Sequence, residues 1–152
     1  MRGRGEGWVV AQFVLMGFVV ALGFVPSRWP EGARTATAVV GASLALAGLV
    51  FAVWAARTLG RSLTPFPRPV PAGLVERGPY RLVRHPIYLG GLLFFGGYAL
   101  FTASVAALVL TGALGLLWAG KARVEERLLA EVYPEYAGYT RRVRARIIPF
   151  VY

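Results

Sequence analysis

The sequence predicts an all-α integral membrane protein with about four transmembrane helices, a short C-terminal helical hairpin and a cytoplasmic amphipathic C-terminal helix. Two observations carry this prediction. The 152 residues are 57% hydrophobic, whereas soluble domains contain about 45–50% apolar residues. The apolar residues also gather in stretches close to the roughly 20 residues that cross a bilayer. The length suits one domain, so residues 1–152 are treated as a single membrane domain.

The first two spans are expected at residues 8–25 and 36–56. The first follows a basic start, as a signal peptide does, but it is too long and lacks a clear cleavage site. We interpret it as a retained transmembrane helix. The second carries small residues spaced i, i+4, i+7 and i+11, which form a smooth stripe for close helix packing: Gly41, Ala45, Gly48 and Ala52.

The third and fourth spans share residues 86–119 and are separated near the polar stretch 101–104. This pattern favours a tight hairpin of two short helices over one very long helix. The Gly90-Gly91 and Gly96-Gly97 pairs are expected to pack against neighbouring helices. Residues 122–133 then predict an amphipathic helix that ends before Pro134.

The segment between the second and third spans has proline at every second position: Pro65, Pro67, Pro69 and Pro71. The restrictions on proline and on the residue before it predict an extended segment that is not helical. It lies across the helix ends or serves as a linker.

The net charge of +10 is placed as the positive-inside rule expects. Residues 57–84 carry six arginines against one glutamate, and the chain from Lys121 onward carries seven basic residues against four glutamates. These two regions should face the cytoplasm, with both termini, in the cell inner membrane. Charges that fall between apolar spans indicate membrane lipid as the partner and argue against nucleic acid.

The residue inventory excludes several classes of site. The chain has no cysteine, which rules out disulfides, thiol catalysis and cysteine-based metal centres. It also has no aspartate and only one histidine, so no metal site is predicted.

The single histidine lies where a charged, proline-rich stretch gives way to an apolar one. His85 precedes Pro86, which suits the first position of a helix. The N–H groups of that first turn would favour an anion: Ile87, Tyr88 and Leu89. Arg81 and Arg84 stand just before it. The alternative is that both arginines extend to lipid headgroups and that His85 caps the helix.

A pair of glutamates follows the fourth span. At 100° per residue, Glu125 falls within the apolar face of residues 122–133 and Glu126 falls at its edge. An ionised carboxylate in an apolar face is costly without a partner, so Glu125 should have a fixed one: an arginine, a hydroxyl or amine of a ligand, or a proton. Glu126 should be satisfied by Arg123 or by water. The alternative for Glu125 is a structural ion pair with an interfacial arginine.

Tyrosines spaced by three precede four arginines near the C-terminus: Tyr133, Tyr136, Tyr139, Arg141, Arg142, Arg144 and Arg146. The simplest interpretation is an aromatic and basic belt that touches anionic lipid. A tyrosine that stacks on a planar ligand is the alternative.

Taken in order, these motifs resemble the membrane-embedded methyltransferases related to isoprenylcysteine carboxyl methyltransferase and phospholipid methyltransferase. The resemblance covers about residues 57–152, and residues 1–56 match only in being two apolar spans. The Arg-His-Pro triplet alone is weak evidence for this family, but the whole set of motifs in this order is specific for it. The matching residues are Gly78-Pro79-Tyr80, Arg84-His85-Pro86-x-Tyr88-x-Gly90, Glu125-Glu126-x-Leu128, the three tyrosines and Ile148-Pro149-Phe150.

The resemblance implies an S-adenosylmethionine-dependent transferase whose lipophilic substrate enters from the bilayer. Residues 57–152 would form the cofactor-binding and catalytic region. The methionine carboxylate suits the start of the third span with His85, the ammonium or ribose hydroxyls suit Glu125 or Glu126, and the adenine suits Tyr88 or Tyr136. The implied cofactor-binding residues are Tyr80, His85, Pro86, Tyr88, Leu89, Gly90, Glu125, Glu126 and Tyr136.

The implied reaction is an in-line displacement at a sulfonium methyl group, driven by positioning and by exclusion of water. For a carboxylate acceptor no base is needed, and Arg84 is the candidate that orients it. For an amine acceptor a carboxylate must help to remove a proton, and Glu126 is the candidate. The acceptor and the oligomeric state stay open.

Two other classes compete with this interpretation. Membrane sterol reductases resemble the same C-terminal pattern and use NADPH, but this chain has too few spans and a Glu-Glu pair in place of an Asp-Glu-like one. A non-catalytic lipid-binding membrane protein would keep the pocket shape without binding a cofactor. A direct cofactor-binding test separates the three.

Overall fold

The computed structural model describes residues 5–25, 29, 31–67, 69 and 73–149, and the regular elements among these residues are all helices, with no strand. Pro71 of the proline-rich segment and Phe150 of the closing motif lie outside the described residues. The elements are α1 (Glu6–Gly23), η1 (Glu31–Ala33), α2 (Arg34–Leu59), η2 (Gly60–Ser62), η3 (Gly78–Arg81), α3 (Pro86–Phe101), α4 (Val105–Val132) and α5 (Tyr136–Arg142), where η marks a 3₁₀ helix.

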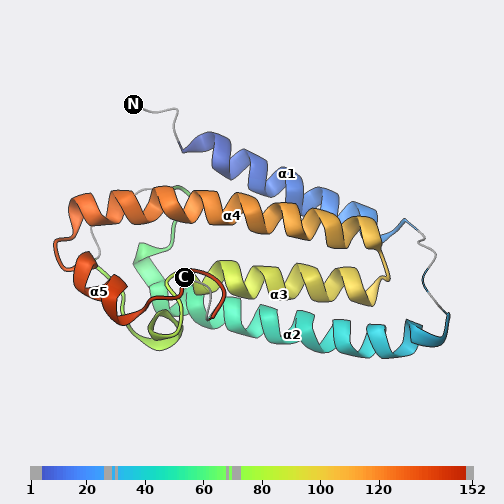
Figure 1. Ribbon diagram of the computed structural model, residues 1–152. Coiled ribbons are helices and arrows are strands. Elements are labelled where there is room, and N and C mark those ends of the chain that lie inside the picture. Colours follow the sequence, from blue (N-terminus) through green and yellow to red (C-terminus); the bar gives the residue numbers. More distant parts are fainter. Residues whose placement is uncertain (1–4, 26–28, 30, 68, 70–72, 150–152) are drawn as a thin grey trace.

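The four long helices lie side by side in the order α1, α4, α3, α2 (Figure 1). The predicted hairpin is confirmed, because α3 ends at Phe101 and α4 begins at Val105, but only α3 is short, since α4 has 28 residues. Ser104 is the N-cap residue of α4. Its hydroxyl oxygen accepts a hydrogen bond from the backbone N–H of Ala107, with 3.2 Å between oxygen and nitrogen. The polar tip therefore ends one helix and begins the next.

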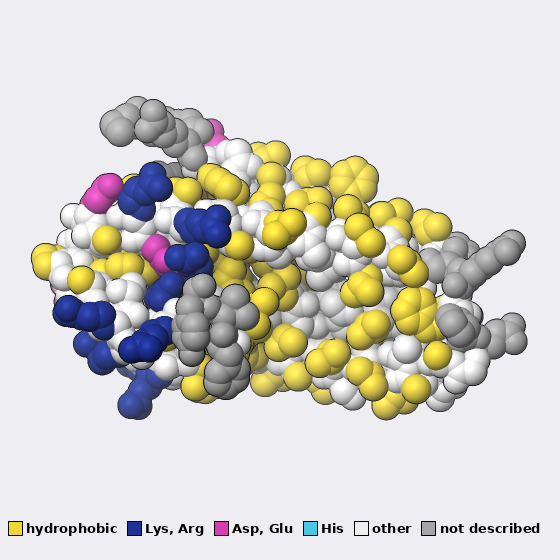
Figure 2. All heavy atoms as spheres, in the orientation of Figure 1, with side chains coloured by type: hydrophobic (Ala, Val, Ile, Leu, Met, Phe, Trp, Pro, Cys, Tyr) yellow, Lys and Arg dark blue, Asp and Glu magenta, His cyan; other side chains and the backbone are white. Residues whose placement is uncertain are grey.

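Within the described part of the chain, three helical stretches are long and apolar enough to cross a membrane: Glu6–Gly23, Arg34–Ser62 and Val105–Val132. The third predicted span, α3, has only 16 residues, or about 24 Å at 1.5 Å per residue. It is shorter than a hydrocarbon core of about 30 Å. Figure 2 shows hydrophobic side chains along most of the bundle, while lysine and arginine gather at the end that holds α5.

The small-residue stripe of α2 packs closely on α3, as predicted. A Cβ atom added at Gly48 would lie 2.6 Å from the carbonyl oxygen of Gly90, and one at Gly97 would lie 2.6 Å from that of Gly41. Only glycine lets the two backbones approach this closely. Of the predicted glycine pairs, Gly90 and Gly97 face α2, whereas Gly96 faces open space.

This packing makes a prediction about stability. Gly48→Ala should lower the free energy of unfolding by about 1–3 kcal/mol, because the new methyl group forces α2 away from α3. Gly96→Ala is the matched control and should leave stability unchanged or raise it, since alanine is the better helix former. Thermal unfolding in detergent measures both. Equal effects of the two variants would contradict the close packing.

The amphipathic stretch at residues 122–133 is helical, but it is not a separate element. It forms the last turns of α4, which runs unbroken for 28 residues. No residue between the apolar part of α4 and its glutamate pair interrupts the helix, so α4 continues into the site. The helix ends where Tyr133 takes an extended conformation before Pro134.

The prediction that the C-terminal tyrosines form a belt in contact with lipid is wrong for Tyr136 and Tyr139. Tyr136 and Tyr139 are only 4% and 2% exposed, and they pack with Val143 and the half-buried Leu74 and Leu129. The repeat of three residues places both rings inward, because α5 folds back against the end of α4. They form a small second core and do not face lipid.

Candidate functional site

A cavity of about 560 Å³ lies among α1, α2, α3, α4, α5 and the segment between α2 and η3. This volume falls in the range of about 300–1,000 Å³ typical of small-molecule sites. Residues 63–67, which we call the proline loop, form part of its wall and are not helical, as predicted. The polar side chains in the wall are Gln12, Ser62, Thr64, Tyr80, Arg84, His85, Tyr88, Lys121, Glu125, Tyr133, Tyr136 and Tyr139.

Arg84 and His85 are held by the C-terminal segment. Their backbone N–H groups donate to the carbonyls of Ala145 at 3.0 Å and Arg146 at 2.8 Å. The Arg84 guanidinium also donates to the carbonyls of Val143 and Arg144 at 2.9 and 2.8 Å. His85 occupies the N-cap position of α3, but its side chain makes no capping bond. Lipid snorkelling by Arg84 and capping by His85 are therefore both wrong.

Glu126 is the centre of an ion network. One carboxylate oxygen accepts from Arg84 Nε at 2.8 Å and lies 3.1 Å from His85 Nε2. The other accepts from Arg146 Nε at 3.0 Å. The expected arginine partner, Arg123, is wrong, because a helical wheel of α4 does not include the segments that pack on this helix. The network ties α4 to the start of α3 and to the C-terminal segment.

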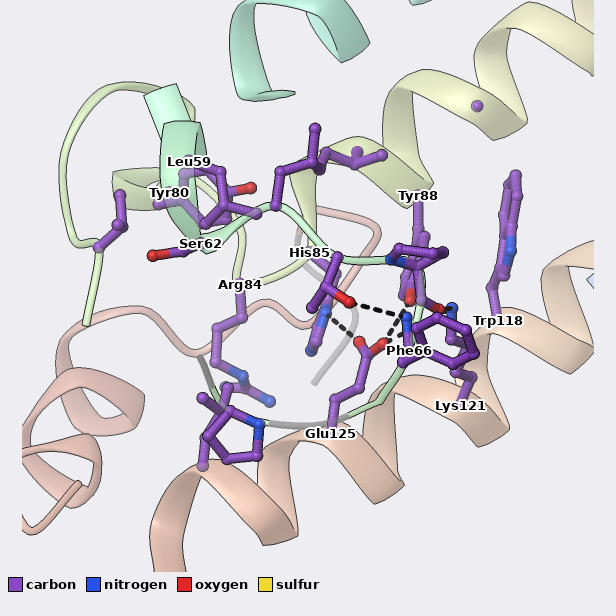
Figure 3. A pocket seen from close by; sticks show the side chains of 18 of the residues that line it. Leu59, Ser62, Phe66, Tyr80, Arg84, His85, Tyr88, Trp118, Lys121 and Glu125 are labelled. Carbon is purple, nitrogen blue, oxygen red and sulfur yellow. Dashed lines mark hydrogen bonds and ion pairs between the residues drawn. The ribbon is translucent and has the colours of Figure 1, made fainter. Parts of the chain in front are cut away.

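Glu125 has fixed partners, as its place in the apolar face predicts, but they are a tyrosine, a histidine and a lysine and not the expected arginine. The Tyr88 hydroxyl donates to one carboxylate oxygen at 2.7 Å, and His85 Nδ1 lies 3.4 Å from the other. Lys121 Nζ lies 3.7 Å away, one helical turn earlier. Figure 3 shows these side chains converging on Glu125. Unlike Glu126, Glu125 lines the cavity and is open to a ligand.

His85 bridges the two glutamates through both ring nitrogens. Burial alone would lower the pKa of His85, but hydrogen bonds and charges from Glu125 and Glu126 outweigh it and raise this pKa above its usual value. The imidazolium form, in which both nitrogens donate, fits this geometry.

The raised pKa predicts how stability depends on pH. His85 contributes stability that is fully present below its unfolded pKa of about 6.5 and is lost as pH rises through its higher folded pKa. The melting temperature of the wild-type protein should fall over that interval. His85→Gln should show a flatter profile, and parallel profiles for the two proteins would contradict the protonated bridge.

Three rings form a stack along one wall. The His85 and Tyr88 rings are 5.5 Å apart and the Tyr88 and Trp118 rings 5.2 Å apart, each pair within 10° of parallel. Gly91 makes room for this stack, because an added Cβ would lie 2.6 Å from the Trp118 ring. The stack joins the ionic cluster to the apolar interior of the bundle.

Three further tyrosines in the cavity wall, Tyr80, Tyr136 and Tyr139, are buried and neutral. The Tyr139 hydroxyl donates to the carbonyl of Tyr80 at 2.7 Å. Burial raises the pKa of Tyr80, Tyr136 and Tyr139. These three side chains therefore offer rings and hydroxyl groups, not charges, to a ligand.

The structure brings most of the predicted residues to one place. Tyr80, Arg84, His85, Tyr88, Glu125 and Tyr136 line the cavity, and Pro86, Leu89, Gly90 and Glu126 do not. The prediction that the first N–H groups of α3 are free to bind an anion is wrong for Tyr88 and Leu89, because both donate to the carbonyl of His85. The first turn of α3 is tight enough to satisfy them itself.

Sequence reasoning missed a second polar group in the cavity. Lys121 Nζ and Trp118 Nε1 both donate to Gln12 Oε1, at 3.0 and 3.3 Å. The sequence does mark both residues as unusual, because Gln12 is the only polar side chain within residues 8–25 and Lys121 is the only lysine of the chain. Lys121 also precedes Glu125 by one helical turn and so shares its face.

The chain is similar to two curated proteins over most of its length. The chain is 34% identical over 139 residues to the cobalt-zinc-cadmium resistance protein CzcN of Cupriavidus metallidurans. It is 29% identical over 139 residues to the nickel-cobalt-cadmium resistance protein NccN of Alcaligenes xylosoxydans xylosoxydans. Each match covers 90% of this chain but only 59% and 60% of the relatives, so the chain spans about six-tenths of their length.

Residues 36–136 match the phospholipid methyltransferase family. The matched region runs from α2 to the first residue of α5 and includes the ionic cluster of His85, Glu125 and Glu126. Since the match covers about two thirds of the sequence, the chain belongs to the phospholipid methyltransferase family.

Proposed function

We propose that this protein transfers a methyl group from S-adenosylmethionine to a lipophilic acceptor at the cytoplasmic face of the inner membrane, with both termini on that side. The observation that carries the proposal is the placement of Glu125. Its carboxylate lines a ligand-sized cavity at the end of an apolar bundle, and His85 and Tyr88 hold it in place.

The donor set of the cavity fits the cofactor. Glu125 offers a carboxylate to its ammonium or ribose hydroxyls, and Tyr136 offers a buried ring to its adenine. His85 and Arg84 supply positive charge for its carboxylate. Arg84 uses four of its five N–H groups on Glu126 and on backbone carbonyls, which leaves one for a ligand.

The apolar part of the cavity wall suits an apolar acceptor. Phe13 and Met16 of α1, Ala52 of α2 and Phe95 of α3 line it. These side chains come from the candidate membrane-crossing helices α1 and α2 and from α3, and they carry no charge. An acceptor with an apolar chain would place it there and its polar group near Glu125.

Glu125, Arg84, His85 and Tyr136 would hold the cofactor, which would supply an activated methyl group to a lone pair of the acceptor and leave as S-adenosylhomocysteine. The protein holds the two reactants in line and excludes water. For an amine acceptor we propose Glu125, not Glu126, as the carboxylate that takes the proton. Glu125 faces the cavity, whereas three cationic side chains occupy the oxygens of Glu126.

A transfer assay tests this proposal. The purified protein, in bilayers made from a total bacterial lipid extract, is incubated with methyl-labelled S-adenosylmethionine. Label should enter the fraction that organic solvent extracts, and Glu125→Gln should abolish this. Release of the label by mild alkali would identify a carboxylate acceptor, and resistance would identify an amine. Equal incorporation by wild type and variant would contradict the proposal.

A further inference from the structure

Lys121 is a buried charge that the proposed reaction does not use. It is the single lysine among 17 basic residues, and it is only 1% exposed. It nevertheless lines the cavity, with its ammonium 5.5 Å from the centre of the Tyr88 ring. A buried ammonium is costly unless oxygens surround it, so its partners show what it holds.

Those partners come from three different parts of the fold. Nζ donates to the carbonyl of Pro65 in the proline loop at 2.7 Å and to Gln12 Oε1 of α1 at 3.0 Å. Its third neighbour is Glu125 Oε1, at 3.7 Å on α4 itself. Both Lys121 and Trp118 donate to Gln12 Oε1, which fixes the orientation of that amide. One ammonium thus joins the N-terminal helix, the cavity wall and the candidate cofactor ligand.

We propose that Lys121 is a positioning residue that holds the proline loop and α1 against Glu125 and so controls how long the cofactor stays bound. This inference rests on the proposed function, because it concerns the same cavity. Lys121 needs no contact with the ligand for this role. A compact ammonium can meet three oxygens from different directions, which the planar fork of arginine does less well. This accounts for lysine at this position in a chain that otherwise uses arginine.

The test is the dissociation rate of S-adenosylhomocysteine from the purified protein in detergent. Lys121→Met keeps the apolar stem and removes the charge. Glu125 keeps Tyr88 and His85 as partners in this variant. We expect the dissociation rate to rise about tenfold and the association rate to change much less. Lys121→Arg should restore the rate only in part.

A control variant separates positioning from general destabilisation. Leu114 is fully buried on α4 but does not line the cavity. Leu114→Ala should lower the melting temperature without changing the dissociation rate. A Lys121→Met protein that releases the ligand at the wild-type rate would overturn the proposal, as would an equal rise in the Leu114→Ala protein.

Gln12→Leu keeps the proposal testable if Lys121→Met does not fold. It removes one tether and leaves the pair of Lys121 and Glu125, so its dissociation rate should also rise. If both variants fold, the double variant should match Lys121→Met alone, since both act through one ammonium. A wild-type rate for Gln12→Leu would overturn the proposal. Failure of the wild-type protein to bind S-adenosylhomocysteine would instead contradict the proposed function.

Discussion

Glu125→Gln should weaken the binding of S-adenosylhomocysteine by about 100-fold, because a neutral amide replaces a carboxylate that offers charge-assisted hydrogen bonds. The protein should stay folded in detergent. The amide oxygen of glutamine can still accept from the Tyr88 hydroxyl, which is the shortest contact of Glu125. Calorimetric titration measures the affinity, and a thermal melt without ligand measures the fold.

Glu131→Gln is the matched control for this variant. Glu131 lies on the same helix and has the same charge, but it is exposed and outside the cavity. Its substitution should leave the affinity unchanged. Normal binding by Glu125→Gln would remove Glu125 from the cofactor site and make Glu126 the better candidate.

Glu126→Gln should have the larger effect on stability. It would leave Arg84, His85 and Arg146 facing one another in a site where the carboxylate side chain is only 12% exposed. Removing one partner of a buried ion pair costs about 3–5 kcal/mol, mainly because the remaining charges lose their counter-ion. We expect a loss of about 3 kcal/mol in the free energy of unfolding, measured by chemical denaturation in mixed detergent.

An exposed ion pair provides the comparison. Glu76 pairs with Arg142, whose side chain is 61% exposed. Glu76→Gln should cost less than about 1 kcal/mol, as surface pairs do. If Glu76→Gln and Glu126→Gln proved equally mild, the network around Glu126 would not be what joins α4 to the C-terminal segment.

Local patterns predicted the helices and several contacts between them. The stripe that contains Gly41 and Gly48 identified the face of α2 that packs, because close helix contact depends on side-chain size along one face. The polar tip before Val105 predicted the hairpin. The place of Glu125 in an apolar face predicted a buried carboxylate with a fixed partner, which is confirmed. Each of these properties belongs to a single helix or turn.

Other features depend on segments that are distant in sequence. Glu126 binds Arg84, 42 positions earlier, and Lys121 binds Gln12, 109 positions earlier. A helical wheel of α4 contains neither partner, so it placed Glu126 at the edge of the buried face. The tyrosine spacing was ambiguous for the same reason, since only the fold-back of α5 decides that Tyr136 points inward.

The site also explains why the helices differ in length. α3 begins at Pro86, beside the ionic cluster, whereas α4 continues past it to Val132. The longer helix therefore carries Glu125 and Glu126 beyond the apolar part of the bundle, toward the basic end visible in Figure 2. A polar cofactor would meet an apolar acceptor at this boundary.

The most direct test of the central claim is a calorimetric titration of the purified wild-type protein with S-adenosylhomocysteine, with NADPH titrated in parallel. We expect saturable binding of S-adenosylhomocysteine with one site per chain and no binding of NADPH. Binding of NADPH alone would contradict the claim and support a reductase. Binding of neither would also contradict it and support a lipid-binding membrane protein without a cofactor.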